Sequence, residues 1–594
     1  MNPTIRRAGL WLAAALLACA GEPVKKASDA AAQTSPAAAP VAAVPAPAAA
    51  VPVAPAAPAT PALPGTAAAA AEGQLKAEAA LAAGQLRATA AAAAEKVKAE
   101  AVAAAAALQP VVPSVLALPA NNKAAVAIQL RFHTGAVDDP PGKAGITYLA
   151  ARVMVEGGAG ALDTKALLGA LFPIAAELDV RVDKEQTTFF AKVHRDALGT
   201  LVPILGDVLL RPRWDAREFE RIKDSAINDL EKRLRQGDDE NLGKAALSAL
   251  LYRGHPYERL TRGHASELKR LTLEETRAHA ARAFTASRLT VGVAGGYPAT
   301  LPTQLVQTLT ALPASAAPAP PVLPVAGLDS PGKPRFLLVE KQGASTAISI
   351  GLPWALGRKS PDWPAMAVAG SAIGEHRQFN GRLMQRLRES RGLNYGDYAY
   401  LEHFEQDGFD ASTAQTGRAR TQQEFTVWLR PVQNENRLFA VRAALYELQR
   451  SLDAEPFSQA EVAQTKGFLD GYLLLFDQTD ARKLGYALDE AFYGNSHYLS
   501  GLREALGAIT PEAVNAAWKK WVDPAKLQIV LVGPGMAAVK KALLAGTPTP
   551  ILYQDANVKR PQAQLDADAE IAKLTFGQLS EADIELVPVE KLFE

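Results

Sequence analysis

Cysteine is almost absent from this sequence, which has one cysteine, Cys19, among 594 residues. A chain with a single cysteine forms no disulfide within itself, so a large hydrophobic core has to stabilise the folded part. An excess of charge of either sign is also missing, because 63 Lys and Arg residues balance 62 Asp and Glu residues. A net charge near zero gives no basic surface of the kind that binds nucleic acid, and we predict no nucleic-acid partner.

Several motifs of catalysis are missing as well. The eight histidines show no H-x-H, H-x3-H or H-x-x-E-H spacing of the kind that zinc sites use. Glu375 and His376 are adjacent, but Ala372 stands three residues before the glutamate, where a histidine would be needed. No G-x-S-x-G elbow and no phosphate-binding P-loop occurs, so the sequence does not support serine hydrolysis or phosphoryl transfer.

The N-terminus has the layout of a bacterial secretion signal. Arg6 and Arg7 precede an apolar run over residues 8–18, and L-L-A-C (16–19) resembles a lipoprotein box. About eleven apolar residues are too few to span a bilayer, which takes roughly 20, so a retained membrane anchor fits less well. We predict a signal peptide over residues 1–19, lipidation of Cys19, and a membrane-anchored lipoprotein of the cell envelope that faces the periplasm.

Residues 20–113 are expected to separate this anchor from the folded body. Up to about Pro64 the chain is mostly Ala, Pro and Val without periodicity, which is typical of an extended linker. Residues 73–109 contain no proline and favour a helix. Their larger apolar side chains keep no heptad, so we interpret them as a solvated spacer helix and not as a coiled-coil partner site.

The remainder of the chain contains an internal duplication. Residues 271–295 align without a gap with residues 509–533, and each segment has the pattern of a capped helix that leads into a strand. The opening strands, predicted at 125–133 and 346–352, repeat too, with alternating apolar and polar residues. We therefore predict two homologous halves, over residues 114–312 and 335–545, a Pro/Ala-rich linker over residues 313–334, and a C-terminal extension over residues 546–594.

One segment of the first half has the apolar periodicity of a helix. It runs from Gly142 to Gly160 and reads G-K-A-G-I-T-Y-L-A-A-R-V-M-V-E-G-G-A-G. One face carries Ile146, Leu149, Ala150, Val153 and Met154, and two glycines end the run as a helix C-terminus would. The other face carries Tyr148, Ala151 and Arg152.

With the preceding R-F-H-T-G-A-V-D-D-P-P, this segment resembles the zinc helix of the insulinase-type (M16) metallopeptidases, whose motif is H-x-x-E-H. The resemblance puts the two histidine ligands on Tyr148 and Arg152 and the general-base glutamate on Ala151. The third ligand of the family falls on Asp229, which follows Arg152 by 77 residues. One carboxylate alone does not hold zinc, which takes three protein ligands and a water. We therefore predict that this chain binds no metal and no other cofactor.

In the second half, residues 381–396 read G-R-L-M-Q-R-L-R-E-S-R-G-L-N-Y-G and are similar to another M16 signature, R-L-x-x-x-L-R-E-x-x-G-L-x-Y. The resemblance implies that Arg388 and Tyr395 bind the substrate carbonyl and stabilise the developing oxyanion. The alternative is that both residues are structural. The fold that the resemblance implies is α+β, with two homologous halves, each an antiparallel sheet with helices packed on one face, that form a clamshell.

A lost zinc motif beside an intact Arg/Tyr signature favours one function over two others. It indicates a substrate-binding subunit that is inactive alone and supplies Arg388 and Tyr395 to a zinc-bearing M16 partner subunit for peptide hydrolysis. The alternative is a non-catalytic pseudo-peptidase that acts as a structural or peptide-binding lipoprotein. A self-sufficient hydrolase with other ligands is a third possibility, for which the sequence offers no constellation of residues.

The lipidation site leads to a direct test. Cys19→Ala removes the only thiol that can be acylated, so the protein is expected to move from the membrane fraction to the soluble fraction. Fractionation of cells that express each form, followed by immunoblotting, measures this. Unchanged fractionation would show that Cys19 does not anchor the protein.

Overall fold

The computed structural model describes residues 112–314, 332–375, 378–404, 416–555 and 557–594. The predicted signal peptide, Cys19, the spacer helix, His376 and most of the predicted inter-half linker lie outside these ranges. In the described part of the chain, every helix is too short or too polar to cross a bilayer.

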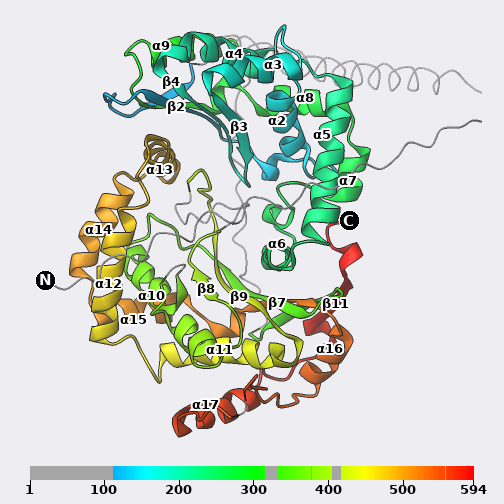
Figure 1. The fold of residues 1–594 in the computed structure, drawn as a ribbon, viewed down its shortest axis with the longest axis vertical. Helices are drawn as coiled ribbons and strands as arrows, with labels where there is room; N and C mark the ends of the chain where they lie inside the picture. The colour runs from blue at the N-terminus through cyan, green and yellow to red at the C-terminus, as the bar shows by residue number, and fades with distance from the viewer. Residues whose placement is uncertain (1–111, 315–331, 376–377, 405–415, 556) are drawn as a thin grey trace, which may run out of the picture. The chain divides into compact units, whose positions relative to one another are not determined.

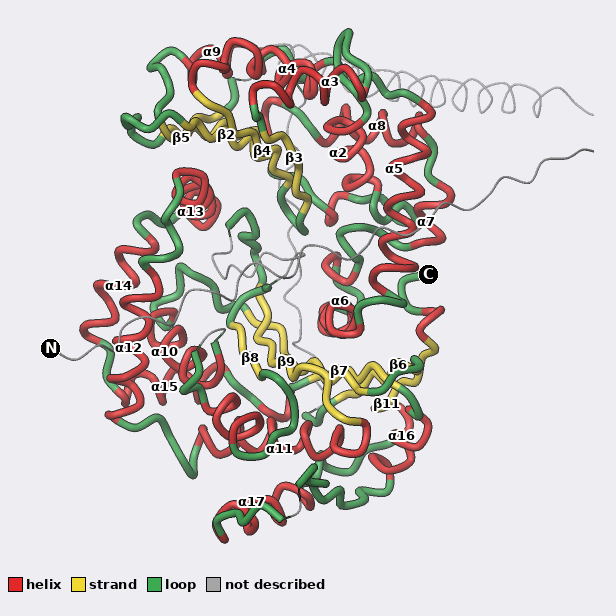
Figure 2. Tube along the Cα trace, in the orientation of Figure 1, coloured by secondary structure: helices red, strands yellow, loops and turns green. Residues whose placement is uncertain are grey.

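Eleven strands are described in two β-sheets, one in each half (Figures 1 and 2). The strands of the first sheet are β1 (Ser114–Ala117), β2 (Ala125–Phe132), β3 (Glu177–Val182), β4 (Thr187–His194) and β5 (Leu289–Gly295). Those of the second sheet are β6 (Arg335–Glu340), β7 (Ser345–Trp354), β8 (Asp397–Tyr400), β9 (Gln423–Gln433), β10 (Gln528–Gly533) and β11 (Ile584–Pro588).

The two sheets repeat one topology. The order is β1-β5-β2-β4-β3 in the first sheet and β11-β6-β10-β7-β9-β8 in the second. When β11 is left out, β6 to β10 occupy the same positions in the second sheet as β1 to β5 occupy in the first. Corresponding pairs of neighbouring strands are also parallel or antiparallel alike. The predicted α+β fold with two homologous halves is confirmed.

The sheets are mixed, whereas the resemblance implied purely antiparallel ones. β1 pairs in parallel with β5, β6 pairs in parallel with β10, and β11 pairs in parallel with β6. In each half, most of the helices lie between the opening strand and the strand that pairs with it in parallel, and a connection of this length permits parallel pairing. Strand β11 comes from the C-terminal residues 584–588 and lies at the edge of the second sheet, beside β6.

Helices of the same half cover one face of each sheet (Figure 2). The first half has α2 (Ile146–Glu156), α3 (Thr164–Leu171), α4 (Leu198–Leu210), α5 (Ala216–Asn228), α6 (Asp239–Leu251), α7 (Ala265–Arg270), α8 (Leu273–Ala283) and α9 (Leu301–Leu309). The second half has α10 (Trp363–Gly374), α11 (Arg437–Leu452), α12 (Gln459–Leu473), α13 (Asp480–Tyr493), α14 (Tyr498–Ala508), α15 (Pro511–Trp521), α16 (Met536–Leu544) and α17 (Gln562–Lys573).

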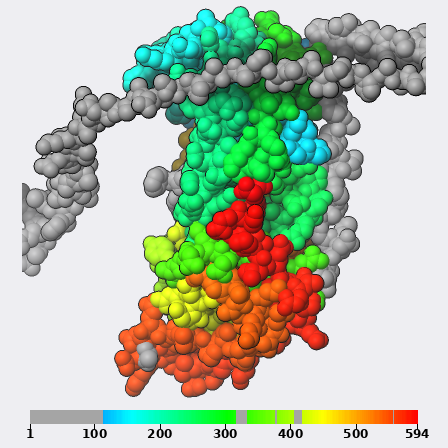
Figure 3. All heavy atoms as spheres, turned by 90° about the vertical axis from the view of Figure 1, so that its right-hand side faces the viewer, coloured from blue at the N-terminus to red at the C-terminus, as the bar shows by residue number. Residues whose placement is uncertain are grey.

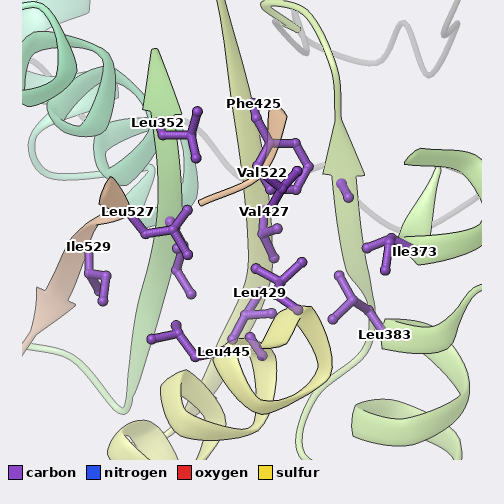
Figure 4. Packing of buried hydrophobic residues seen from close by; sticks show 14 of the residues in the cluster. Leu352, Ile373, Leu383, Phe425, Val427, Leu429, Leu445, Val522, Leu527 and Ile529 are labelled. Carbon is purple, nitrogen blue, oxygen red and sulfur yellow. The ribbon is translucent and has the colours of Figure 1, made fainter. Parts of the chain in front are cut away.

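The alternation of side chains along a strand builds the core of the second half. Phe425, Val427 and Leu429 of β9 point to one face, where they pack with Leu445 of α11 and Ile373 of α10 (Figure 4). The residues between them along β9 point to the opposite face. That opposite face contributes to the candidate site.

The opposite face of each sheet is covered by a helix from the other half (Figure 1). Helix α6, from the first half of the sequence, lies on β7 and β10 of the second sheet, where Leu247 packs with Ala347 and Val532. Helix α13, from the second half, lies on β2 and β5 of the first sheet, where Leu484 and Leu488 pack against Ala294 of β5. The two halves therefore exchange a helix.

The C-terminal residues also return to the first half, and Figure 3 shows them in red against residues of that half. The buried guanidinium of Arg235 donates from Nε to the Leu592 carbonyl at 2.6 Å. The Ala265 amide donates to the Phe593 carbonyl at 3.0 Å, and the Phe593 ring packs beside α6.

Buried ion pairs join the two halves across these helices. Arg131 of β2 donates from Nη1 to Oδ1 of Asp489 on α13 at 2.7 Å, and each of the two side chains is 1% exposed. The same carboxylate accepts from Arg358 at 3.4 Å and from the Gly417 amide at 3.0 Å. A second buried pair, Arg420 with Asp183, lies elsewhere between the halves.

Removal of the shared carboxylate is expected to destabilise the protein. Asp489→Ala leaves the guanidinium of Arg131 buried without its counter-charge, and breaking a buried pair in this way typically costs about 3 to 5 kcal/mol. Guanidinium-induced unfolding measures the change in the free energy of unfolding. The control is Asp470→Ala, which removes a surface pair with Arg503, and exposed pairs contribute only about 0 to 1 kcal/mol. Equal effects of the two variants would show that the inter-half pair is not needed for stability.

Candidate functional site

Helix α2, which carries the degenerate motif, is fixed at its N-terminus by a buried carboxylate. Asp139 accepts from the amides of Gly145 at 2.7 Å and Thr147 at 3.1 Å, two donors that the first turn of a helix leaves unpaired. Burial raises the pKa of Asp139 to about 7, although these hydrogen bonds oppose the rise. The carboxylate therefore serves as a cap for α2 and has no exposed face for a substrate.

A close approach of two glycines brings another loop to this helix. Gly145 and Gly263 both have φ near +90°, and a Cβ on Gly145 would lie 2.7 Å from the Arg262 carbonyl oxygen. Only glycine fits both conditions, positive φ and backbone contact. As a result, Arg262 lies beside Tyr148 on α2, with its guanidinium carbon 6.0 Å from the centre of the Tyr148 ring.

The structure brings three of the four degenerate positions together around arginine. Asp229 opens a π-helical turn (Asp229–Leu234), and its carboxylate pairs with Arg262 at 3.4 Å. Arg152 pairs with Glu156 and, at 2.7 Å, with Asp179 on the edge strand β3. Ala151 is the exception, because its side chain is fully buried in the hydrophobic core of the first half.

These side chains do not fit a zinc ion. Burial raises the pKa of the Tyr148 phenol above its ordinary value, which keeps it protonated, although Arg262 and Arg152 act in the opposite direction. Zinc takes deprotonated ligands, and two guanidinium groups beside the site would repel it. In the described part of the chain, no group of three or more His, Cys, Asp and Glu side chains could hold a metal.

The second predicted site has a different character. Arg388 lies in a π-helical turn (Met384–Glu389), and its guanidinium carbon lies 5.1 Å from the centre of the Tyr395 ring. Arg430 of β9 lies over the same ring at 5.9 Å. Tyr395 is 72% exposed, so its hydroxyl is open to solvent while the two cations hold its ring. The structure thus brings Arg388 and Tyr395 together.

The other arginines of this signature serve the fold. Arg382 pairs with Glu461 at 2.7 Å, Arg386 pairs with Glu447 and Glu455, and Arg391 pairs with Asp568 at 2.7 Å. These pairs tie the π-helical turn to α11, α12 and α17. In the described part of the chain, Arg388 has one ion pair, with Glu389 at 3.4 Å, and one hydrogen bond, to the Met384 sulfur at 3.5 Å. Its charge is therefore not committed to the fold in the way that the others are.

The two predicted sites remain separate. In the described part of the chain, neither Arg388 nor Tyr395 has a hydrogen bond or ion pair with Tyr148, Arg152 or Asp229. In that part of the chain, the two sites are linked only indirectly. Arg430, which lies over the Tyr395 ring, also lies 3.8 Å from Glu240 near the start of α6, the helix that follows the turn of Asp229. Sequence reasoning missed Arg262 and Arg430, and the only signal for the first was its position next to Gly263 in H-P-Y-E-R-L-T-R-G.

Comparison with known proteins agrees with this geometry. Residues 115–264 match the family described as Insulinase (Peptidase family M16), and residues 270–468 match the Peptidase M16 inactive domain. The chain belongs to the insulinase-like M16 family. The first match contains the degenerate helix α2 and Asp229, and the second contains Arg388 and Tyr395.

Individual relatives in the M16 family are distant in sequence. A protein of Mycobacterium bovis named as an uncharacterized zinc protease is 26% identical over 350 residues, which are 58% of this chain and 74% of that protein. A probable mitochondrial-processing peptidase subunit beta of Arabidopsis thaliana is 26% identical over 122 residues, 20% of this chain and 23% of that one. The crystal structure of a peptidase M16 inactive domain from Pseudomonas fluorescens has a TM-score of 0.62 at 22% identity and covers 71% of this chain and 96% of that chain.

The side chains of the degenerate site lead to a prediction about metal content. Purified protein that has been incubated with zinc and desalted should retain no stoichiometric zinc and should cleave no peptide alone, because Tyr148 stays protonated and Arg152 and Arg262 are cations. Elemental analysis by mass spectrometry measures the first property, and a fluorogenic peptide assay measures the second. About one tightly held zinc per chain, the stoichiometry of a mononuclear site, would contradict the assignment of these positions.

Proposed function

We propose that this chain is the zinc-free subunit of a two-chain M16-type peptidase and that it supplies Arg388 and Tyr395 to a zinc-bearing partner. The observation that carries the proposal is the contrast within one signature. Three of its arginines are bound in structural ion pairs, whereas Arg388 lies against an exposed Tyr395 and, among the described residues, pairs only with its neighbour Glu389.

The two side chains suit the binding of a peptide carbonyl whose oxygen gains negative charge. A guanidinium keeps its charge and donates several N–H groups, and a phenol can donate its hydroxyl proton in a hydrogen bond to an oxyanion. The contacts of Arg388 and Arg430 with the Tyr395 ring hold the phenol before substrate arrives. Donors that are already in position lower the cost of reorganisation during reaction.

The residues of the first half support the proposal of a partner. Its three zinc-ligand positions are occupied by a protonated phenol, an ion-paired guanidinium and one carboxylate that is paired with Arg262. No residue at these positions can activate water, and Ala151 replaces the general base. A relative named as subunit beta of a mitochondrial-processing peptidase supports the idea that members of this family act as subunits. With Cys19 lipidated, the pair would work at the periplasmic side of a membrane.

One observation favours the alternative function. The buried pairs Arg131 with Asp489 and Arg420 with Asp183 fix the two halves together, and α6 and α13 fill the faces between them. Such a body also suits a structural or peptide-binding pseudo-peptidase that cleaves nothing. The two functions differ in what loss of Arg388 does to a mixed complex.

The test uses this chain co-expressed with a candidate zinc-bearing M16 chain from the same genome. Arg388→Ala or Tyr395→Phe is expected to reduce kcat of the mixed complex by about 10²- to 10³-fold, the typical effect of losing one oxyanion donor. Assembly, measured by size-exclusion chromatography, and the zinc content of the complex should not change. Tyr148→Ala should reduce kcat much less, because Tyr148 holds no reacting carbonyl.

Matched controls separate this effect from a general loss of structure. Arg503→Ala and Tyr446→Phe remove an arginine and a phenol that make surface contacts with Asp470 and Glu570, and both variants should retain full activity. If the complex cleaves peptide equally well with wild-type and Arg388→Ala chains, the pair has no catalytic role. In that case the pseudo-peptidase function would be the better description.

A further inference from the structure

A small pocket lies between the two halves on the polar face of β9. Along this strand, Glu424, Thr426 and Trp428 alternate with the core residues Phe425 and Val427 and so point away from the hydrophobic core. The pocket encloses about 170 Å³. Its opposite walls come from α6, from the π-helical turn that begins at Asp229, and from the loop at residues 260–262.

Buried polar groups that line this pocket lack hydrogen-bond partners. Trp428 and Arg420 are 3% and 2% exposed, yet the indole Nε1 of Trp428 and the Nη1 of Arg420 have no acceptor in the described part of the chain. The hydroxyl of Thr426, also buried, has no partner among the described residues. A buried N–H without an acceptor costs about 1 to 3 kcal/mol, so two such donors in one pocket indicate that an acceptor belongs there.

Charged side chains of both signs line the pocket. Its lining has five cationic side chains, Lys184, Arg233, Lys244, Arg262 and Arg420, and three carboxylates, Asp229, Asp238 and Glu424.

The three carboxylates already have partners on the wall. Asp229 pairs with Arg262 at 3.4 Å, Glu424 with His403 at 2.9 Å, and Asp238 caps α6 through the Asn241 amide at 2.9 Å. Two of the cations also have carboxylate partners outside the lining, since Arg420 pairs with Asp183 and Lys244 pairs with Glu240 at 2.9 Å. The case for an acceptor therefore rests on the N–H groups of Trp428 and Arg420 that lack an acceptor in the described part of the chain.

We propose that this pocket binds the carboxylate of a peptide, either a C-terminal carboxylate or an Asp or Glu side chain, with Trp428 Nε1 and Arg420 Nη1 as donors. Its volume is below the roughly 300 to 1,000 Å³ of pockets that enclose a whole ligand, which fits an end group. Lys244, whose Nζ lies 3.7 Å from the centre of the Trp428 ring and pairs with Glu240 at 2.9 Å, borders the same wall.

The same strand connects the pocket with the Arg/Tyr pair, which is why we take the ligand to be a peptide. Arg430 follows Trp428 by two residues on the same face of β9, about 7 Å along the strand, and it lies over the Tyr395 ring. A short extended peptide can therefore reach from the pocket to Tyr395. The choice of a peptide as ligand rests on the proposed function, but binding in the pocket does not require the partner subunit.

The experiment measures binding of dye-labelled alanine-based hexapeptides to the full-length chain alone by fluorescence anisotropy. One peptide has a free C-terminal carboxylate, a second is its amide, a third is the amide with a central glutamate, and a fourth is the amide with glutamine there. We expect at least about tenfold tighter binding of one acidic peptide than of its neutral counterpart, the usual effect of a hydrogen bond to a charged group. The peptide that binds tightly identifies the source of the carboxylate.

Variants then place the binding in this pocket. Trp428→Phe keeps an aromatic ring, although a smaller one, and removes the indole N–H, and it should weaken binding of the acidic peptide about tenfold and of the neutral peptide hardly at all. The control Trp521→Phe removes an indole N–H that donates to Asp362 at 2.8 Å far from β9 in the sequence, and it should change neither affinity. Thr426→Val provides a second variant in the pocket, and unfolding curves for all variants check that they fold.

Equal affinity for acidic and neutral peptides, or equal behaviour of Trp428→Phe and Trp521→Phe, would overturn the proposal. These outcomes are distinct from failure of the proposed function, because the assay contains no zinc-bearing chain and records no cleavage. Conversely, a mixed complex that depends on Arg388 for cleavage would leave the proposed function intact even if the pocket bound no carboxylate.

Discussion

The buried ion pair between Arg131 and Asp489 is the interaction on which the arrangement of the two halves depends. Two charges that are 1% exposed have lost their hydration, and only their mutual contact, with Arg358 and the Gly417 amide, compensates for it. This requirement helps to hold α13 on the first sheet, where Gln129 also donates to the Ala481 carbonyl at 2.8 Å. The hydrophobic contacts of Leu484 and Leu488 with Ala294 follow from the same placement.

The exchange of helices has a second consequence, because it brings charged residues of α6 beside β9. Helix α6 lies on β7 and β10, and its N-terminal part reaches β9, where Lys244 meets Trp428 and Glu240 meets Arg430. The side of β9 that faces away from the core thus lies between residues of both halves. Both the pocket and the support of the Tyr395 ring depend on this contact, although the residues are far apart in the sequence.

The degenerate zinc site illustrates how a lost ligand set can be stabilised by charge. Cations at or beside the former ligand positions are neutralised by Asp229, Glu156 and Asp179. The site is therefore a satisfied electrostatic network, and α2 keeps its place through the Asp139 cap and the hydrophobic core. Loss of metal chemistry and retention of the helix are compatible for this reason.

Much of the fold was accessible from local patterns. The α2 periodicity, the capping box at Thr272 and the strand β2 depend on residues a few positions apart, and all three are present in the structure, although both faces of β2 are buried. The parallel pairing of β1 with β5 was not accessible, because pairing direction depends on strands more than 170 residues apart. Nor did periodicity indicate that the polar residues of β2 meet α13, because alternation identifies a polar face and not what covers it.

For the candidate site, the sequence by itself determined which chemical groups are present: a phenol, a guanidinium and an alanine in place of zinc ligands and base, and an intact Arg388 and Tyr395. Those identities limit the possible chemistry wherever the groups lie. Only the tertiary structure decided that Arg262 joins Asp229 through the contact of two glycines, that Arg430 supports Tyr395, and that unpaired donors on β9 face a pocket. These relations depend on distances between segments remote in the chain, which are set by packing and by the balance of buried charge.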